Sequence, residues 1–215
     1  MQKHPRRAGR PSQKIPRKVL LRAAIPLFAD AGYAATSLDR IAEACGIRKS
    51  SLIYRFGSKE GLYIESIATV LERLNAMVGT AALSDGDHTE RLDQLSEAIC
   101  DYLGAEPKAA RLLFREAMDQ GPFITGPQGV LFTVILKTAV EFLQAGHDDG
   151  HFSISDPRDM VLTIVGVHLA YFAIEEVSEV VSGDPIYEAQ SLNRRKREVT
   201  LQVRRLCGVQ PSSDA

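Results

Sequence analysis

The sequence predicts an all-α protein in two parts, and three observations lead to that prediction. Apolar residues recur at intervals of three and four along most of the chain, as they do on one face of an α-helix. Proline or a hydroxyl residue precedes many of these stretches and glycine follows most of them, which are common helix start and stop signals. No alternating apolar pattern typical of a β-strand is long enough to be useful. The composition, 45% hydrophobic and 25% charged over 215 residues, is that of a globular chain.

Residues 1–16 are polar, basic and interrupted by proline, so we expect a flexible basic arm. A helix is predicted from Arg17, and Gly32 should end it because glycine accepts the left-handed conformation found at helix C-termini. Pro26 lies inside this helix and is expected to kink it. One face of the helix is apolar: Leu20, Ala24, Leu27, Phe28 and Ala31.

Two short helices follow, and together they predict a helix-turn-helix. Either Thr36 or Ser37 can cap the first helix, and Gly46 should end it. The second helix, about 48–56, begins at once, and two short helices joined by a tight glycine-containing turn form this motif.

Ser58 is predicted to cap a long helix, and the small, polar segment 79–88 is expected to be an interdomain loop. More amphipathic helices are predicted near 89–104, 107–120, 127–145, 157–181 and 185–206. The predicted organisation is therefore an arm (1–16), a three-helix helix-turn-helix DNA-binding domain (17–62) and a helical ligand-binding and dimerisation domain (63–215).

The charge distribution predicts a polyanionic partner at the N-terminal end of the chain. Residues 1–60 carry a net charge of +9, whereas the remainder carries −10. The three cysteines are far apart and form no C-x-x-C pair, which favours a reducing, cytoplasmic location and excludes zinc ribbons. The longest apolar stretch, Met160 to Ile174, is shorter than the ~20 residues of a membrane helix, so no membrane association is expected.

The segment 17–62 resembles the TetR family of transcriptional regulators. About a dozen residues or short runs match in register over a fifth of the chain, whereas the rest resembles the family only in helix count and in details from Phe142 to Pro157. The resemblance implies a helix-turn-helix that binds DNA and C-terminal helices that form a ligand pocket and a dimer interface. The matching residues are Leu27-Phe28-Ala29, Gly32-Tyr33, Ala35-Thr36-Ser37, Ile41-Ala42, Ala44, Gly46-Ile47, Lys49, Leu52, Tyr54, Phe56 and Ser58-Lys59-Glu60.

The second helix of such a motif enters the major groove with its N-terminal residues near the base edges. Those residues are Arg48, Lys49, Ser50 and Ser51. Thr36 and Ser37, at the start of the first helix, are expected to meet phosphates as well as to cap the helix.

The resemblance adds Tyr54 and Lys59 as phosphate contacts. Arg55 stands where the family commonly has His and adds a charge, so the operator sequence cannot be transferred from relatives. Arg10 lies in a Gly-Arg-Pro sequence that resembles minor-groove hooks, and the alternative is a disordered tail that adds non-specific attraction.

The predicted dimer interface combines the apolar 157–181 helix with the last helix, whose stripe is Leu192, Val199, Val203 and Leu206. His168 is the most distinctive residue of the candidate pocket, although a hydrogen-bonded core histidine is the better expectation for it. The ligand-binding candidates are Phe114, Met118, Phe132, Leu136, Met160, His168 and Tyr171.

These features predict a homodimeric repressor that binds a pseudo-palindromic double-stranded DNA operator and is released by a small organic ligand. A transcriptional activator or a ligand-independent repressor is the alternative within regulation, and an all-α enzyme using the C-terminal pocket is the other class. No catalytic motif occurs, so no enzymatic activity and no cofactor are predicted. The segment His147 to His151 contains metal-binding residue types but is expected to be a polar turn, so no metal is predicted.

Overall fold

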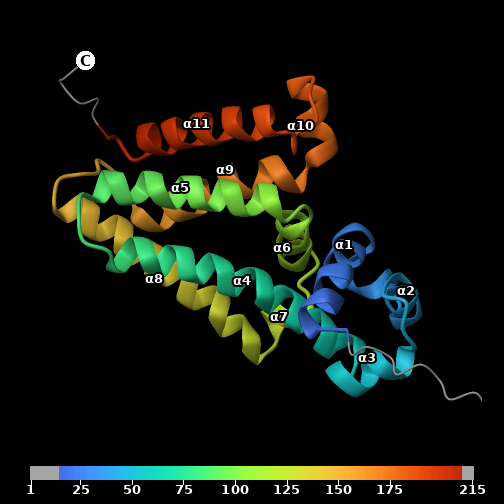
Figure 1. Ribbon diagram of the computed structural model, residues 1–215. Helices are drawn as coiled ribbons and strands as arrows, with labels where there is room; N and C mark the ends of the chain where they lie inside the picture. Colours follow the sequence, from blue (N-terminus) through green and yellow to red (C-terminus); the bar gives the residue numbers. More distant parts are fainter. Residues whose placement is uncertain (1–14, 210–215) are drawn as a thin grey trace, which may run out of the picture.

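The protein, as a computed structural model, is described over residues 15–209, and these residues form helices joined by short loops. Helices α1 to α3 lie together at one end of the molecule (Figure 1). Helix α4 leads from this group into a bundle, in which α4 and α8 form one layer, α5 and α9 the next, and α11 covers α5 (Figure 1). The predicted all-α fold is confirmed.

Helix α1 (Arg17–Ala35) contains Pro26 and is interrupted at Gly32, whose φ of 80° and ψ of 168° are not helical. Such a backbone conformation is essentially restricted to glycine because it has no Cβ. The predicted stop at Gly32 is therefore a break, after which one more turn of helix leads to Thr36.

Helices α2 (Leu38–Ala44) and α3 (Lys49–Phe56) form the predicted helix-turn-helix. The inner face of α2 packs against α1 and α3, and that of α3 packs against α2 and α4, so their opposite faces remain available to solvent. The buried residues of the two helices are Ile41, Ala42, Leu52 and Phe56.

Helix α4 (Lys59–Leu83) begins at Ser58, whose hydroxyl accepts a hydrogen bond from the Gly61 backbone N–H at 3.0 Å. The predicted boundary after residue 62 lies inside this helix. The expected loop at 79–88 is wrong over its first half, because α4 continues to Leu83 and the turn is 84–87. Small residues allow α4 to pack closely against α5 there, with Ala81 buried.

The second domain, within the described residues, contains two more α-helices than the sequence predicted, α7 and α10. Helix α7 occupies the segment that was expected to be a loop between the second and third C-terminal helices. The elements are α5 (His88–Ala105), α6 (Ala109–Met118), α7 (Pro122–Thr125), the 3-10 turn η1 (Pro127–Gly129), α8 (Val130–Asp148), α9 (Pro157–Ala173), α10 (Glu175–Ser182) and α11 (Ala189–Leu206).

The single helix predicted over 157–181 is in fact two helices, α9 and α10, bent by 84° at Ile174. Side chains of α6 hold the bend. Arg111 donates to the Ala173 carbonyl at 3.0 Å and pairs with Glu176, while Lys108 pairs with Glu175 at 2.7 Å. Ion pairs with a neighbouring helix therefore compensate for the loss of helix continuity at the break.

Most of the stripe of α11 that was expected at a dimer interface packs inside the protomer, whereas Leu206 at its end is 37% exposed. Val199 and Val203 are buried against α5, and the Leu192 side chain lies close to Gly104. The acidic and apolar composition of α5 explains this arrangement, since Lys196 pairs with Asp101 at 2.8 Å beside the apolar contact.

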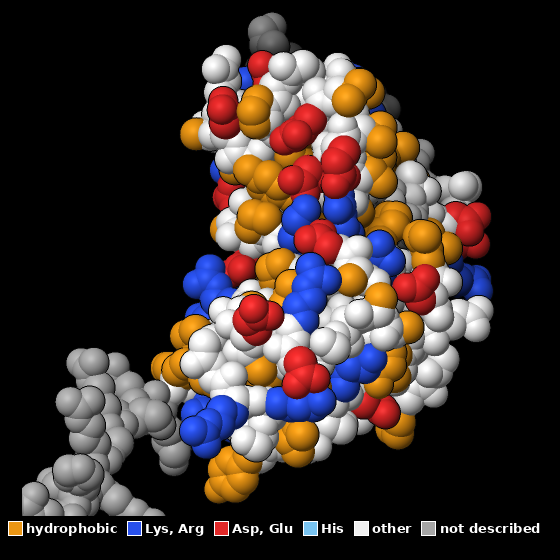
Figure 2. Space-filling model, turned by 90° about the vertical axis from the view of Figure 1, so that its right-hand side faces the viewer, with side chains coloured by type: hydrophobic (Ala, Val, Ile, Leu, Met, Phe, Trp, Pro, Cys, Tyr) orange, Lys and Arg blue, Asp and Glu red, His pale blue; other side chains and the backbone are white. Residues whose placement is uncertain are grey.

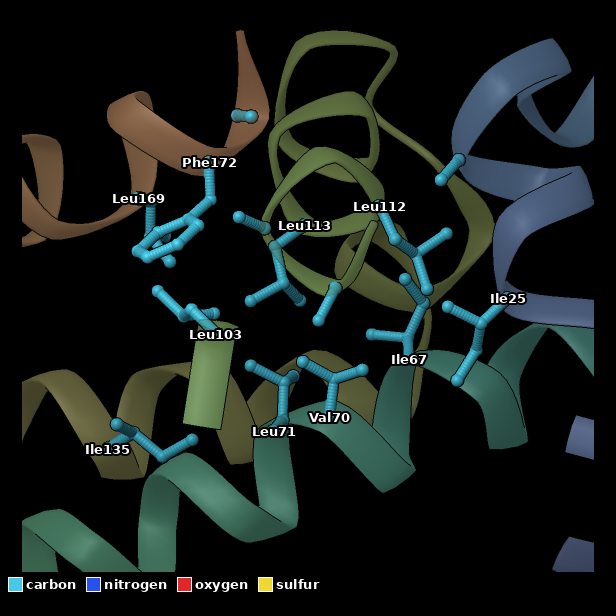
Figure 3. Close-up of a cluster of buried hydrophobic side chains, with 14 of the residues drawn as sticks. Ile25, Ile67, Val70, Leu71, Leu103, Leu112, Leu113, Ile135, Leu169 and Phe172 are labelled. Carbon is cyan, nitrogen blue, oxygen red and sulfur yellow. The ribbon is translucent and has the colours of Figure 1, made fainter. Parts of the chain in front are cut away.

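The hydrophobic core is continuous from the helix-turn-helix domain into the bundle. Figure 3 shows Ile25 of α1 facing Ile67 and Val70 of α4, and Leu112 of α6 lies beside them. The same cluster extends through Leu113 to the side chains of α8 and α9 (Figure 3). A shift of α6 or α4 would therefore change the packing of side chains in both domains.

Candidate DNA-binding surface and ligand cavities

Helix α3 presents a polar face to solvent. Its residues Arg48, Lys49 and Ser50 are exposed at the N-terminal end, and Ser51 is half-buried. Tyr54 is 88% exposed although it is a large aromatic residue, which is unusual for a residue that makes no contact outside the chain. The predicted base-reading end of the helix is therefore accessible.

Lys49 is held by the first helix of the motif. Its Nζ lies 2.8 Å from Asp39 Oδ2, and both side chains are half-exposed. Ser37 is the N-cap of α2, where its hydroxyl accepts a hydrogen bond from the Arg40 backbone N–H at 3.2 Å. Ser37 is exposed, so its predicted phosphate contact is sterically open.

Thr36 does not have the predicted role. It is 1% exposed, and its hydroxyl donates to the Gly32 carbonyl at 2.8 Å, with the Leu27 carbonyl also within reach at 3.0 Å. The hydroxyl is turned inward toward two carbonyls of α1, and the Gly32 carbonyl accepts from the Thr36 backbone N–H as well. Thr36 therefore stabilises the end of α1, and its neighbour Ser37 is the cap.

Arg55 also points away from the expected surface. Its guanidinium donates to the Ile15 carbonyl, and the Arg55 carbonyl in turn accepts from Arg17 at 2.7 Å. Arg17 pairs with Glu65 and lies over the Phe56 ring. Arg55 thus belongs to a network that holds the start of α1 against α3 and α4.

Lys59 is half-buried at the start of α4. Its Nζ donates to the Tyr33 carbonyl at 2.9 Å and to the Ala34 carbonyl at 3.2 Å, and it lies 4.4 Å from the centre of the Tyr33 ring. The ammonium group therefore satisfies carbonyls after the break in α1. Its predicted phosphate contact stays a prediction.

Positive side chains gather at the helix-turn-helix end of the molecule. Figure 2 shows Lys and Arg spread over the lower half of the face at that end, where α1 to α3 lie. This distribution agrees with the charge asymmetry in the sequence. The proposed minor-groove residue Arg10 lies outside the described residues.

Helix α6 connects this domain to the bundle through buried polar contacts. Arg115 donates to the Ala29 carbonyl at 2.7 Å and to the Asp30 carbonyl at 2.9 Å. The neighbouring Glu116 is fully buried and accepts from the Tyr63 hydroxyl at 2.7 Å. Burial, and then the hydrogen bond to Glu116, raise the pKa of Tyr63.

Two narrow apolar cavities lie between α4, α8 and α9. One, of about 60 Å³, is bounded by residues that include Leu71, Leu113 and Phe132. The other, of about 80 Å³, lies toward α5. Both are bounded by Ile135, Leu136 and Val165, so they are neighbours along α8.

Two of the seven predicted ligand residues, Phe132 and Leu136, line these cavities. Met118 does not, because it is 75% exposed at the end of α6. Phe114, Met160 and Tyr171 are half-buried and line none of the cavities described here. The Tyr171 ring instead lies under the Arg195 guanidinium, 4.6 Å away.

His168 is a core residue. It is 3% exposed, and its Nδ1 lies 2.9 Å from the Ile164 carbonyl, while Nε2 has no hydrogen-bond partner. Burial lowers the pKa of His168, so the ring is neutral at pH 7. It borders neither apolar cavity, which agrees with the core histidine that the sequence favoured.

Within residues 15–209, no group of three or more His, Cys, Asp or Glu residues is arranged to hold a metal ion. In the turn that was considered as a metal site, His151 lies 3.0 Å from Asp87, and His147 lies 3.2 Å from the Phe152 carbonyl.

Comparison with known families identifies both domains. The model for bacterial regulatory proteins of the tetR family matches residues 20–65, and the model for the tetracyclin repressor-like C-terminal domain matches residues 89–203. The chain belongs to the TetR family. It is therefore a DNA-binding transcriptional regulator.

Individual TetR relatives match parts of the chain. The transcriptional activator FasR of Mycolicibacterium smegmatis is 30% identical over 131 residues, which are 59% of this chain and 58% of FasR. IcaR, a negative regulator of the icaADBC biofilm operon in Staphylococcus aureus, is 42% identical over 80 residues, or 37% of this chain and 41% of IcaR. The chain thus matches less than two thirds of either relative.

The fold of a solved TetR structure covers most of the chain. AibR, crystallised in complex with isovaleryl coenzyme A and operator DNA, superimposes with a TM-score of 0.68 at 16% identity, covering 90% of this chain and 98% of AibR.

Helix α8 and its preceding turn, residues 127–148, are long and apolar enough by composition to cross a membrane. The most apolar 18-residue window of this segment has a mean hydropathy of 1.4. Helix α8 packs against α4 and α9, and 17% of its apolar window is buried within the protomer.

The sequence analysis did not identify the residues of α5 that border cavities in the ligand domain. Arg91 is 8% exposed and lies on the same face of α5 as Leu95, four residues later. A charged residue on the apolar face of a predicted helix was the signal that could have found it.

Proposed function

We propose that this TetR-family protein is a homodimeric repressor that binds a pseudo-palindromic operator and is released by a small organic ligand. The observation that carries the proposal is the connection of an exposed reading helix, α3, to apolar cavities through α4 and α6. Arg115 and Tyr63 stand at that connection. A ligand that prefers one position of α6 would change how the reading helices are held.

Exposed apolar residues support the dimer. Leu162 of α9 is 63% exposed and Leu201 of α11 is 46% exposed, although both helices also contribute to the core. Helix α10 adds Val180 and Val181, each 83% exposed. Large apolar residues left exposed on adjacent helices are typical of a protein–protein interface.

In such a dimer the two α3 helices would read half-sites about one DNA turn apart, ~34–36 Å. Arg48, Ser50 and Ser51 would face the base edges, while Tyr54, Ser37 and Lys59 would contact phosphates. We place the protein in the cytoplasm, where its DNA is, and propose that it is not an enzyme.

The experiment is selection of bound fragments from genomic DNA, followed by titration of the recovered operator and a reporter assay. We expect a pseudo-palindromic site and a rise in reporter expression when the protein is deleted. Light scattering should give twice 23.6 kDa at micromolar concentration. A monomer alone, or an operator without repeated half-sites, would contradict the proposal.

Activation is the second candidate, since the relative FasR is an activator. The same reporter distinguishes the two functions, because deletion of an activator lowers expression.

A further inference from the structure

Helices α4 and α5 border a cavity of about 300 Å³ that is open to solvent past Thr80 and Gln94 and lies apart from the residues predicted to bind ligand. Met77, Thr80 and Ala81 of α4 form one side, and Arg91, Gln94 and Leu95 of α5 form the other. Arginine is the one charged residue in this lining, and no carboxylate faces it.

Arg91 is an unusual residue because it is buried without an acidic partner among residues 15–209. It is 8% exposed, its Nε has no hydrogen-bond partner, and no carboxylate lies within 4 Å of its guanidinium. One NH group donates to the Ser84 carbonyl at 2.6 Å, and the guanidinium lies 5.3 Å from the centre of the Phe142 ring. These contacts hold the group in place but do not neutralise its charge.

A buried cation without a counter-ion is costly, and an anion bound beside it would recover part of that cost. The planar guanidinium presents N–H groups whose geometry matches a carboxylate. The free Nε–H of Arg91 is one such donor.

The cavity with Arg91 adjoins the apolar cavities of the bundle. Leu95 lines both the 300 Å³ cavity and the 80 Å³ cavity, and Phe142, on which Arg91 packs, lines the latter. Beyond them, the 60 Å³ cavity continues along α8 past Leu136. The three cavities therefore lie in series, each sharing at least one apolar lining residue with the next, and this series is the channel considered for a ligand.

We propose that the ligand of this regulator is a linear aliphatic carboxylate, with its head group on Arg91 and its chain in the channel along α8. The inference rests on the proposed ligand-released function and specifies the chemistry of the ligand. A single carboxylate matches one unpaired guanidinium, and an unbranched chain matches small apolar cavities that follow one another along α8. Leu95 lies where the chain would pass from one cavity to the other.

The test compares dodecanoate with methyl dodecanoate, which has the same chain without the charge. Binding is measured by calorimetry on the full-length protein, and operator release by fluorescence anisotropy. We expect wild-type protein to bind the acid at least tenfold more tightly than the ester. This comparison needs no variant, so it does not depend on the folding of a mutant.

Two variants then assign the preference to Arg91. Arg91→Gln should bind acid and ester equally, and Arg91→Lys should recover part of the preference because it keeps the charge. Arg158→Gln is the matched control, since its side chain is 83% exposed on α9. Filling the channel with Leu136→Phe should weaken binding of the acid in the same calorimetric titration.

The outcomes separate this inference from the proposed function. Equal release by acid and ester, or an unchanged preference in Arg91→Gln, would overturn the role of Arg91 and leave ligand release intact. Release by dodecanoyl coenzyme A with no effect of the free acid would also overturn it. Failure of the protein to bind the selected operator in the absence of any ligand would contradict the proposed function itself.

Discussion

The contact between Tyr63 and Glu116 provides the sharpest test of how the two domains are joined. Tyr63 is 2% exposed and Glu116 is fully buried, and the Tyr63 hydroxyl donates to Oε2 at 2.7 Å. The other carboxylate oxygen accepts from the Ile124 backbone N–H at 2.7 Å. Tyr63→Phe would remove one of these two donors and leave its acceptor buried.

The cost can be worked from the surroundings of the carboxylate. A hydrogen bond to a charged group contributes about 1.5–3 kcal/mol to folding, and removal of one partner leaves the other unsatisfied. Water cannot easily replace the hydroxyl, since Oε2 is packed so closely against Gly121 that a Cβ there would lie 1.9 Å from it. We therefore expect a loss of about 2–3 kcal/mol in unfolding free energy.

For a chain of this size, that loss corresponds to a fall in Tm of roughly 5–10 °C. The contacts of the Tyr63 ring with Phe28 and Tyr33, at 4.8 and 4.9 Å between centroids, survive the substitution, so the effect belongs to the hydroxyl. Urea unfolding at a fixed protein concentration measures it, because association also affects apparent stability.

Tyr54→Phe is the matched control, since the same hydroxyl is removed from a residue that is 88% exposed. Its unfolding free energy should change by less than about 0.5 kcal/mol. The reasoning is refuted if Tyr63→Phe is no more destabilising than Tyr54→Phe. A double-mutant cycle with Glu116→Gln should show coupling between the two positions, and strict additivity would mean that the hydrogen bond contributes nothing.

Lys59→Ala should weaken binding to operator and to scrambled DNA alike, and it should reduce the slope of log affinity against log salt concentration by about one unit. Ser51→Ala should change the preference among operator variants by ~1 kcal/mol and leave that slope unchanged. If Lys59→Ala instead relaxed the sequence preference and kept the wild-type slope, the domain would lie differently on DNA. Because burial lowers the pKa of His168 below its ordinary 6.5, the unfolded chain binds its proton first, so this residue should reduce stability as pH falls below 6.5. Urea unfolding of wild type and His168→Gln at pH 7.5 and 5.5 measures this, and an equal pH dependence in both proteins would exclude His168 as the cause. Gly32→Ala should cost about 1–3 kcal/mol in thermal or urea unfolding, since its φ of 80° is strained for alanine, and a wild-type Tm would show that α1 can continue without the break.

The sequence predicted the elements whose signals are local. Ser58 and Gly32 act through their own chemistry, and the structure starts α4 after Ser58 and breaks α1 at Gly32, although α1 resumes as far as Ala35. The 84° bend after Ala173 could not be predicted in this way. No glycine or proline lies at the bend, and the break depends on Lys108 and Arg111, which are more than sixty residues away in the chain.

The same distinction holds for the candidate sites. Exposure of Ser50 and Tyr54 follows from the period of α3, because each lies two residues from Leu52, which must face the core with Phe56. The inward orientations of Thr36 and Arg55 do not, since each depends on where the fold places a backbone carbonyl, that of Gly32 for Thr36 and that of Ile15 for Arg55. Met118 was misplaced because hydrophobicity alone does not show which residues at a helix end are covered.

The groups that hold the end of α1 have a consequence for building hybrid regulators. Arg115 of α6 and Lys59 of α4 donate to main-chain carbonyls of Ala29, Asp30, Tyr33 and Ala34, not to the side chains of those residues. Every amino acid carries such a carbonyl, so these contacts depend on the shape of the interrupted helix. Two side chains of that segment take part in the attachment as well: Asp30, which pairs with Lys108 and Arg111, and Tyr33, whose ring lies under Lys59. A DNA-binding domain from another regulator should therefore dock on this ligand domain if it keeps the glycine break, the acidic residue and the aromatic ring, which makes the junction a natural point at which to exchange operator specificity.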